Sequence, residues 1–343
     1  MKFRHRKPLR TLTATALVLI APLALASCAL SSQAAGKNPD SSVVIRYEGS
    51  ANTVNLPELA EDLGYLDGVD LQWVGNNNSG PASIQNTATG ATDMGSAFAG
   101  AVVKLQEAGA KVTAVVSSYG SNEATNYTFY VRDDSEIKDP RDLIGKSVAV
   151  NTLGAHSEAV LGSYLRDSGL SEEEIKQVQL LVLPPSDTEQ AIRSGQVDAG
   201  ALGSVFREHA VDQGGLRPFL SDIDAYGDFN AGQYVLRDDF IEQNPEAARI
   251  LATGIGKAAD WASSHSREEV VERLTGIIEK RDRGESTEPL KFFRSFAVGE
   301  HGSIKDEDFT RWSQWLNETG IVQGEITPSD YYTNEYNDLA NGK

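Results

Sequence analysis

The chain contains one six-residue pattern twice, once in each half. Gly-x-x-Asp-x-Gly occurs at residues 90–95 and again at residues 195–200. Both copies follow a short amphipathic stretch and lead into an apolar one, as a helix ended by glycine, a tight turn and a strand would. The pattern alone is a common helix-to-strand joint, but the elements predicted around the two copies occur in the same order. We therefore infer that one α/β lobe is present twice.

Short β-branched stretches alternate with helical patterns from residue 41 onward. Residues 43–47 predict a strand, and residues 56–66 predict a helix with leucines at helical spacing. A second series begins at Asp139, which can cap a helical turn, and continues with a strand predicted over residues 147–151. Alternating strands and helices predict an α/β fold with mostly parallel sheets and right-handed crossovers.

Two further stretches, residues 127–134 and 233–239, share a strand pattern and end in Arg-Asp-Asp. We interpret them as strands that cross between the lobes and form a hinge. The expected domains are lobe I, residues 41–130 plus 235–343, and lobe II, residues 131–234. The chain after the second stretch shows only helical patterns, and we expect this tail to pack on lobe I.

The N-terminus resembles a secretory signal that ends in a lipoprotein cleavage site. The first ten residues include five basic and no acidic side chains, and an uncharged apolar run follows. Residues 25–28, Leu-Ala-Ser-Cys, resemble the lipobox of bacterial lipoproteins. We predict a signal peptide over residues 1–27, lipidation of Cys28 and a flexible tether over residues 28–40. The alternatives are a plain signal or an uncleaved anchor helix, and Pro22 argues against the anchor.

Cysteine content and charge exclude several kinds of protein. Cys28 is the only cysteine, so the chain can form neither a disulfide scaffold nor a cysteine-based metal site. The 31 basic and 49 acidic residues give a formal net charge of −18, which disfavours a nucleic-acid partner. An anionic ligand would have to be held by a local field in so acidic a protein. We expect a monomer.

The ligand site is expected at the carboxyl ends of the strands, where open α/β sheets bind ligands. A helix starting near Ala155 would direct its free N–H groups and the positive end of its dipole at a carboxylate, sulfonate or phosphate. His156 fits equally well as a donor there or as a surface histidine. Phe98, Tyr119 and Phe206 fit either apolar cleft walls or core packing. The candidate substrate-binding residues are Ser50, Asn52, Ser79, Gly80, Ser96, Ala97, Phe98, Gly154, Ala155, His156, Ser157, Ser204 and Phe206.

Motifs for catalysis are missing from the sequence. It contains no Gly-x-Ser-x-Gly, no His-Glu-x-x-His, no phosphate loop and no Cys-His pairing, and its five histidines are scattered. We therefore expect no enzymatic activity, no cofactor and no metal site. A purely structural lipoprotein would not need two lobes that face a ligand.

Several stretches together carry a family resemblance. Residues 44–66, residues 143–151 (LIGKSVAVN), residues 180–202 with LPPSD and SGQVDA, and residues 234–251 resemble the extracytoplasmic solute-binding proteins of ABC importers. The similar group binds aliphatic sulfonates, taurine, nitrate and thiamine-pyrimidine precursors. The resemblance implies a type 2 periplasmic-binding-protein fold, two α/β lobes with a ligand cleft and hinge strands. It also implies a small-molecule ligand, a permease and an ATPase as partners, and attachment to the membrane through the lipid anchor.

Two departures from this family bear on the ligand. The turn after the strand at residues 147–151 is Gly-Ala-His-Ser instead of a Gly-Ser-Ser type, and residues 203–206 read Gly-Ser-Val-Phe where Trp-Asp-Pro is frequent. The resemblance implies capture of a small anionic organic solute, sulfonate-, taurine- or nitrate-like. The alternatives are a neutral or heterocyclic solute such as a pyrimidine precursor, or an exported enzyme of the pyrimidine-synthesis-like group.

Overall fold

The computed structural model describes residues 42–343. The predicted signal peptide, the lipidation site Cys28 and the tether lie outside the described residues. None of the helices formed by residues 42–343 combines the length and the apolar character that crossing a membrane requires.

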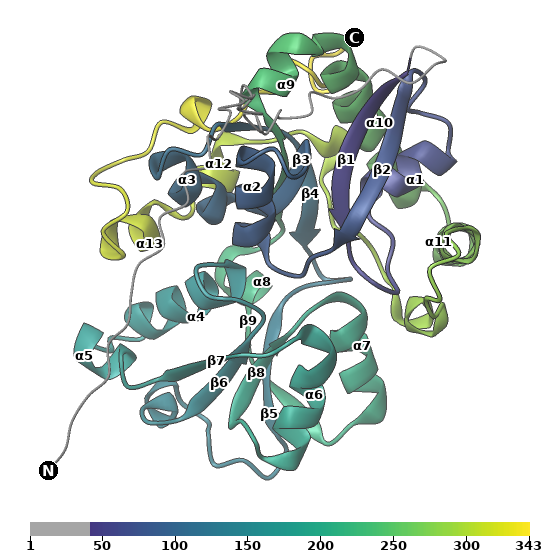
Figure 1. The fold of residues 1–343 in the computed structure, drawn as a ribbon. Coiled ribbons are helices and arrows are strands. Elements are labelled where there is room, and N and C mark those ends of the chain that lie inside the picture. Colours follow the sequence, from purple (N-terminus) through teal and green to yellow (C-terminus); the bar gives the residue numbers. More distant parts are fainter. Residues whose placement is uncertain (1–41) are drawn as a thin grey trace, which may run out of the picture. The chain divides into compact units, whose positions relative to one another are not determined.

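Strands and helices alternate along the described chain as the sequence predicted (Figure 1). The strands are β1 (Val43–Gly49), β2 (Val69–Asn76), β3 (Met94–Phe98), β4 (Val112–Ser121), β5 (Thr128–Arg132), β6 (Ser147–Val150), β7 (Gln179–Val182), β8 (Ala199–Leu202), β9 (Leu216–Ser221) and β10 (Phe229–Arg237). The helices up to β10 are α1 (Leu56–Asp62), α2 (Gly80–Ala88), α3 (Ala99–Glu107), η1 (Pro140–Leu143), α4 (His156–Asp167), α5 (Glu172–Ile175), α6 (Pro185–Ser194), α7 (Ser204–Gln213) and α8 (Asp222–Tyr226).

The chain after β10 is helical, apart from one isolated bridge between Tyr332 and Ala114 of β4. Its helices are α9 (Asp238–Gln243), α10 (Pro245–Ser264), α11 (Arg267–Lys280), η2 (Glu288–Phe292), η3 (Glu300–Gly302), α12 (Asp306–Thr310), α13 (Ser313–Glu318) and η4 (Pro328–Asp330). We call residues 238–343 the tail.

Three sheets order the strands into two lobes. Lobe I contains the pair β1-β2 and the sheet β3-β10-β4, and lobe II contains the sheet β7-β6-β8-β5-β9. Figure 1 shows β1 to β4 in purple and blue, and β5 to β9 in teal. The strands β1 and β2 run parallel, as do β6 and its neighbours β7 and β8, whereas β5 and β10 run antiparallel to their neighbours. The pair β1-β2 is therefore parallel, the sheet β3-β10-β4 is antiparallel and the five-stranded sheet is mixed, whereas mostly parallel sheets were expected.

The antiparallel strands follow the two crossings between lobes. The chain leaves β4 at Ser121 and enters lobe II at Thr128, then leaves β9 at Ser221 and re-enters lobe I at Phe229. The parallel strands of each lobe end at the edge that faces the other lobe. A strand that arrives from the other lobe begins at this same edge, so it runs in the opposite direction. The crossings are residues 122–127 and 222–228, just before the two stretches that the sequence pattern had suggested.

The aspartates of the repeated pattern have the same role in both lobes. Asp93 accepts a hydrogen bond from the backbone N–H of Arg46 (3.0 Å), and its own N–H donates to the carbonyl of that residue (2.9 Å). Asp198 makes the same two bonds with Ser147, at 2.9 and 3.0 Å. Each aspartate therefore fastens the strand that follows it to a neighbouring strand, β1 or β6, and the shared pattern is structural.

The glycines of the pattern are also explained by equivalent geometry. Gly90 and Gly195, which follow α2 and α6, have φ of 79° and 73°, a left-handed conformation that suits glycine. Gly95 and Gly200 lie where a helix contacts the strand closely. A Cβ on Gly95 would be 2.9 Å from the carbonyl oxygen of Ser83 in α2, and one on Gly200 would be 2.8 Å from the Thr188 methyl in α6.

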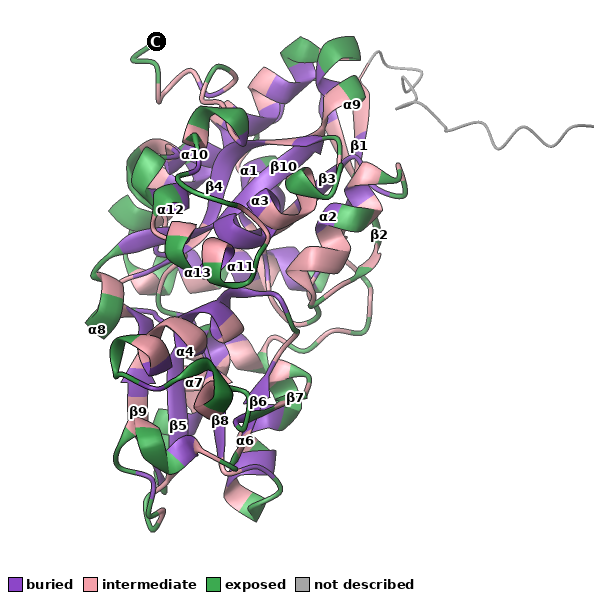
Figure 2. Cartoon of the chain, turned by 90° about the vertical axis from the view of Figure 1, so that its left-hand side faces the viewer, coloured by how far each residue is buried: buried purple, intermediate pink, exposed green. Residues whose placement is uncertain are grey.

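The tail packs on both lobes, not on lobe I alone as expected. Trp312, which is fully buried, contacts Phe98 of lobe I with ring centroids 5.2 Å apart and His156 of lobe II at 5.8 Å. Arg166 of α4 forms an ion pair with Glu318 of α13 at 2.9 Å. In Figure 2 the strands of both lobes are largely buried beneath helices.

We predict that Gly95→Ala lowers the free energy of unfolding by about 1–3 kcal/mol, because the methyl group has no room between β3 and α2. Urea unfolding followed by circular dichroism measures the change. Gly276→Ala in α11 is the matched control, since a Cβ there meets nothing within 4 Å and alanine favours a helix. Equal stability of Gly95→Ala and the wild type would contradict this account of the motif.

Candidate functional site

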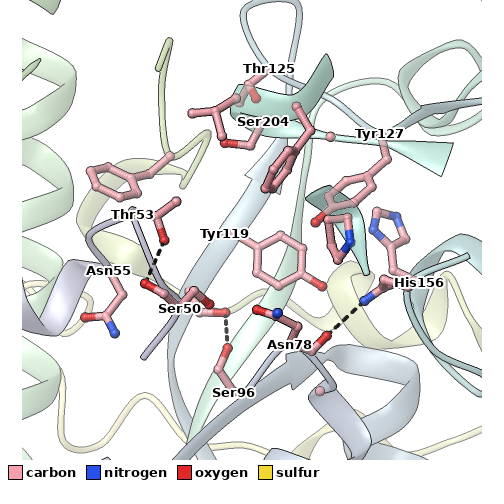
Figure 3. Close-up of a pocket in the computed structure, with 18 of the residues that line it drawn as sticks. Ser50, Thr53, Asn55, Asn78, Ser96, Tyr119, Thr125, Tyr127, His156 and Ser204 are labelled. Carbon is pink, nitrogen blue, oxygen red and sulfur yellow. Dashed lines mark hydrogen bonds between the residues drawn. The ribbon is translucent and has the colours of Figure 1, made fainter. Parts of the chain in front are cut away.

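A cavity of about 510 Å³ opens where the strands of both lobes end. Residues at or just after the carboxyl ends of β1, β2, β3, β4, β6 and β8 line it. Because β5 and β10 run the other way, the residues just before β5, including Tyr127, line it as well. The site therefore lies at the strand ends that the sequence analysis had selected, and Figure 3 shows part of its lining.

Five helices begin at this cavity, two in lobe I and three in lobe II. The first residues of α1, α2, α4, α6 and α7 all belong to its lining, and a capping box with Asn55 already satisfies the start of α1. The first N–H groups of an α-helix have no partner within the helix, and the helix dipole adds a partial positive charge there. The Ser79 side chain caps α2 weakly, with 3.4 Å between its Oγ and the Ala82 nitrogen, whereas no side chain caps the start of α4, α6 or α7.

The predicted binding residues line this cavity with one exception. Gly154 is absent from the lining, and its N–H donates to the Glu158 carboxylate in the first turn of α4, at 2.8 Å. Contact of the other candidates with a solute stays a prediction.

Charged side chains are nearly absent from the lining. Of the described residues around the cavity, Glu48 is the one acidic residue, and none is lysine or arginine. Its two carboxylate oxygens accept hydrogen bonds from the side-chain amides of Asn77 (2.9 Å) and Asn86 (2.8 Å). Asn77 in turn accepts from the N–H of Ser79 at the start of α2 (2.8 Å). Glu48 therefore orders the loop that leads into α2.

The tail fixes the cavity loop at residues 50–55. The guanidinium group of Arg281 donates to the Thr53 carbonyl (2.8 Å) and forms buried ion pairs with Glu58 (2.6 Å) and Glu285 (3.0 Å). Glu285 also accepts from the N–H of Asn52 at 3.2 Å. Asn52 has a φ of 62°, a left-handed conformation that needs such support.

Three polar rings meet on one side of the cavity (Figure 3). The ring centroids of Tyr119 and Tyr127 are 6.3 Å apart, and that of His156 lies 6.3 Å from the first and 5.0 Å from the second. His156 is buried, and neither ring nitrogen has a hydrogen-bond partner among the described residues. Burial lowers its pKa to about 3, so the imidazole is neutral at physiological pH.

A buried carboxylate lies behind these rings. Asp222 accepts hydrogen bonds from the hydroxyl of Ser121 (2.6 Å) and the N–H of Tyr127 (3.2 Å), and its own N–H donates to the Tyr127 carbonyl (3.0 Å). One carboxylate oxygen is 3.3 Å from Nε2 of His156. Burial raises the pKa of Asp222 to about 6.

Sequence reasoning missed several lining residues. Tyr127 had been interpreted only as part of a crossing strand, and nothing in the tail sequence indicated that Phe293 and Phe296 reach the cavity. The Asn-Asn-Asn-Ser run after β2 was a usable signal, because polar residues at the carboxyl end of a strand contribute Asn77 and Asn78. Within residues 42–343, no group of three or more His, Asp or Glu side chains is arranged to hold a metal ion.

We predict that acid destabilises the wild type more than a His156→Gln variant. The pKa of His156 is lowered in the folded protein, so below its unfolded value of about 6.5 only the unfolded chain takes up this proton. From pH 7 to pH 5 the free energy of unfolding should fall by about 2 kcal/mol more in the wild type. Asp222 is present in both proteins, so its own titration largely cancels. Parallel pH curves from denaturant unfolding would contradict the buried neutral state of His156.

Comparisons with known proteins agree with this architecture. Residues 59–269 match the protein family described as NMT1/THI5 like. A protein of Brucella abortus named as a binding protein is 22% identical over 75% of this chain and 79% of its own length. A protein of Escherichia coli named for binding aliphatic sulfonates is 28% identical over 60% of this chain and 61% of its own length.

Solved structures share the fold. The periplasmic aliphatic sulphonate binding protein of Escherichia coli superposes with a TM-score of 0.63 at 21% identity, covering 84% of this chain and 92% of that one. The desulfurization enzyme DSZB superposes with a TM-score of 0.58 at 16% identity, covering 87% and 99%. The fold therefore occurs in both binding proteins and enzymes.

Proposed function

The chain belongs to the NMT1/THI5-like family, and from this premise we propose that it is the solute-binding component of an ABC importer. It captures a small organic anion of the sulfonate, taurine or nitrate kind outside the cytoplasm and delivers it, as a monomer, to a membrane permease driven by an ATPase. The curated relatives named above are binding proteins, and we propose that this chain likewise binds its solute without converting it.

The observation that carries this proposal is the meeting of five helix N-termini, three of them without a side-chain cap, at a cavity whose described lining contains no lysine or arginine. Backbone N–H groups and helix dipoles bind anions without a counter-ion. The N–H donors and the positive ends of the helix dipoles would repel a cationic solute. Glu48 would not offset this, because its carboxylate oxygens already accept hydrogen bonds from two side-chain amides. The relative named for aliphatic sulfonates supports an oxyanion of that class.

Closure around the solute would use the two crossings. Residues 122–127 and 222–228 are the two chain segments that follow β4 and β9 into the other lobe, and they lie side by side through the bonds of Asp222. Polar contacts such as Ser79 to Thr152 (3.2 Å) and Arg294 to Glu208 (2.8 Å) join the lobes at other places. We propose that these contacts form as the lobes close and break as they open.

Small anions should stabilise the protein. We predict that methanesulfonate, taurine or nitrate at 100 times the dissociation constant raises the free energy of unfolding by about 2.7 kcal/mol. Differential scanning fluorimetry measures the shift, and mass spectrometry of the recovered compound checks that it is unchanged. Thymine serves as the neutral heterocycle and choline as the cation. A shift with thymine alone would replace the anion hypothesis by the neutral one, and a changed compound would indicate an enzyme.

We also propose that the chain is exported and anchored by a lipid on Cys28, which lies outside the described residues. The basic start, the apolar run and the Leu-Ala-Ser-Cys stretch at residues 25–28 support this.

Cys28→Ala should abolish lipid modification and leave precursor or released protein, because residues 42–343 form no helix long and apolar enough to cross a membrane. Membrane fractionation and mass spectrometry of the mature N-terminus provide the measurement. A wild-type N-terminus without acyl groups in the membrane fraction would refute the anchor.

A further inference from the structure

We propose that Tyr119, Tyr127 and His156 form the part of the cavity that binds the head group of the solute, and that they bind it as an oxyanion through uncharged O–H and N–H donors. This inference rests on the proposed function and specifies which residues recognise the anion. The three rings are called the ring cluster below.

The first argument is unused hydrogen-bonding capacity. The hydroxyls of Tyr119 and Tyr127 make no hydrogen bond with any described residue, and both half-buried side chains line the cavity. Nδ1 of His156, a residue that is 4% exposed, also lacks a partner, and Nε2 has only the contact with the Asp222 carboxylate at 3.3 Å. A buried polar atom without a partner is costly, and a ligand acceptor beside Nδ1 and the two unpaired hydroxyls would satisfy it.

The second argument is that the rings are held in place before a ligand arrives. A Cβ at Gly203 would lie 2.7 Å from Cε1 of Tyr127, and one at Gly232 would lie 2.7 Å from Cζ of Tyr119. Each tyrosine ring therefore lies flat against glycine backbone that leaves room for it. Such preorganised donors bind without first paying the cost of ordering side chains.

The third argument is charge. Burial raises the pKa of Tyr127 to about 12 and that of Tyr119 well above its ordinary value, so both hydroxyls keep their protons and act as donors. The titratable groups that face His156 are these two tyrosines and Asp222, and the imidazole stays neutral beside them. The ring cluster therefore offers donors without any positive charge. An oxyanion with several acceptor oxygens fits it, whereas an ammonium group does not.

The lobes provide the ring cluster jointly. Tyr119 is near the end of β4 in lobe I, Tyr127 ends the first crossing, and His156 is the first residue of α4 in lobe II. A head group bound by all three would hold the lobes together at the crossings. Recognition of the anion and closure would then depend on the same contacts.

The test uses the full mature protein and the variants Tyr119→Phe and Tyr127→Phe. Phenylalanine keeps the ring packing against glycine and removes only the hydroxyl. Calorimetric titration with methanesulfonate, taurine and nitrate should show affinity lowered by about tenfold or more in each variant. The melting temperature without ligand should stay the same or rise, because the hydroxyl has no protein partner to lose. Tyr164→Phe is the matched control, because Tyr164 also belongs to α4 but lies outside the cavity lining and packs against Phe219.

Measuring affinity as a function of pH tests the charge state of the ring cluster, which a purely structural role would not affect. Affinity for methanesulfonate should stay constant between pH 7 and pH 8.5, because neither the ligand nor the ring cluster changes charge there. A tenfold loss per pH unit would show that a protonated histidine binds the anion, and it would overturn the proposal.

The outcomes separate the two hypotheses. Binding of an anion by the wild type with undiminished affinity in both phenylalanine variants would contradict the ring cluster and leave the proposed function intact. Binding of none of the three anions would contradict the proposed function, and the ring-cluster assignment with it. Lower stability of the variants without ligand, at unchanged affinity, would indicate a purely structural role.

Discussion

The hydrogen bonds of the buried Asp222 carboxylate hold together the two chain segments that connect the lobes. It bonds to Ser121 where the chain leaves lobe I and to the N–H of Tyr127 where it enters lobe II, while it belongs itself to the return crossing. Both connections are thereby tied to each other beside the cavity. Loss of the carboxylate would leave a buried hydroxyl and N–H without partners, which costs about 1–3 kcal/mol for each group.

Local signals in the sequence predicted much of the fold for physical reasons. The repeated pattern at residues 90–95 and 195–200 predicted the glycines with positive φ after α2 and α6, because a helix end depends on residues near in sequence. It also predicted equivalent roles for the aspartates that bind β3 and β8 to their neighbours, because the same unit occurs twice. No local signal in the sequence indicates that β5 and β10 run antiparallel to their neighbours. Their stretches look like the other strands, and only pairing across the sheet decides direction.

The candidate site was predicted less evenly. Residues at strand ends, such as Ser50 and Ser96, could be found because strand order places them at one edge. Tyr127 and the phenylalanines of the tail come to the cavity through long-range packing that no periodicity encodes. Gly154 lies outside the cavity lining, and the nearby Glu158 carboxylate accepts a hydrogen bond from its N–H. The absence of basic side chains from the described lining was also invisible in the sequence, because arginines and lysines are spread along the chain.

The central position of β10 has a consequence for how the protein acquires its structure. Lobe II is built from one continuous segment, so its sheet can be completed as soon as the chain extends to Ser221. Lobe I differs, because β3 and β4 contact each other only through β10, which comes more than a hundred residues after β4 begins. Closing so long a loop carries an entropic cost and slows folding. During synthesis or translocation, β3 and β4 would therefore expose unpaired edges until Arg237 emerges, and this interval is when the chain is most prone to aggregate.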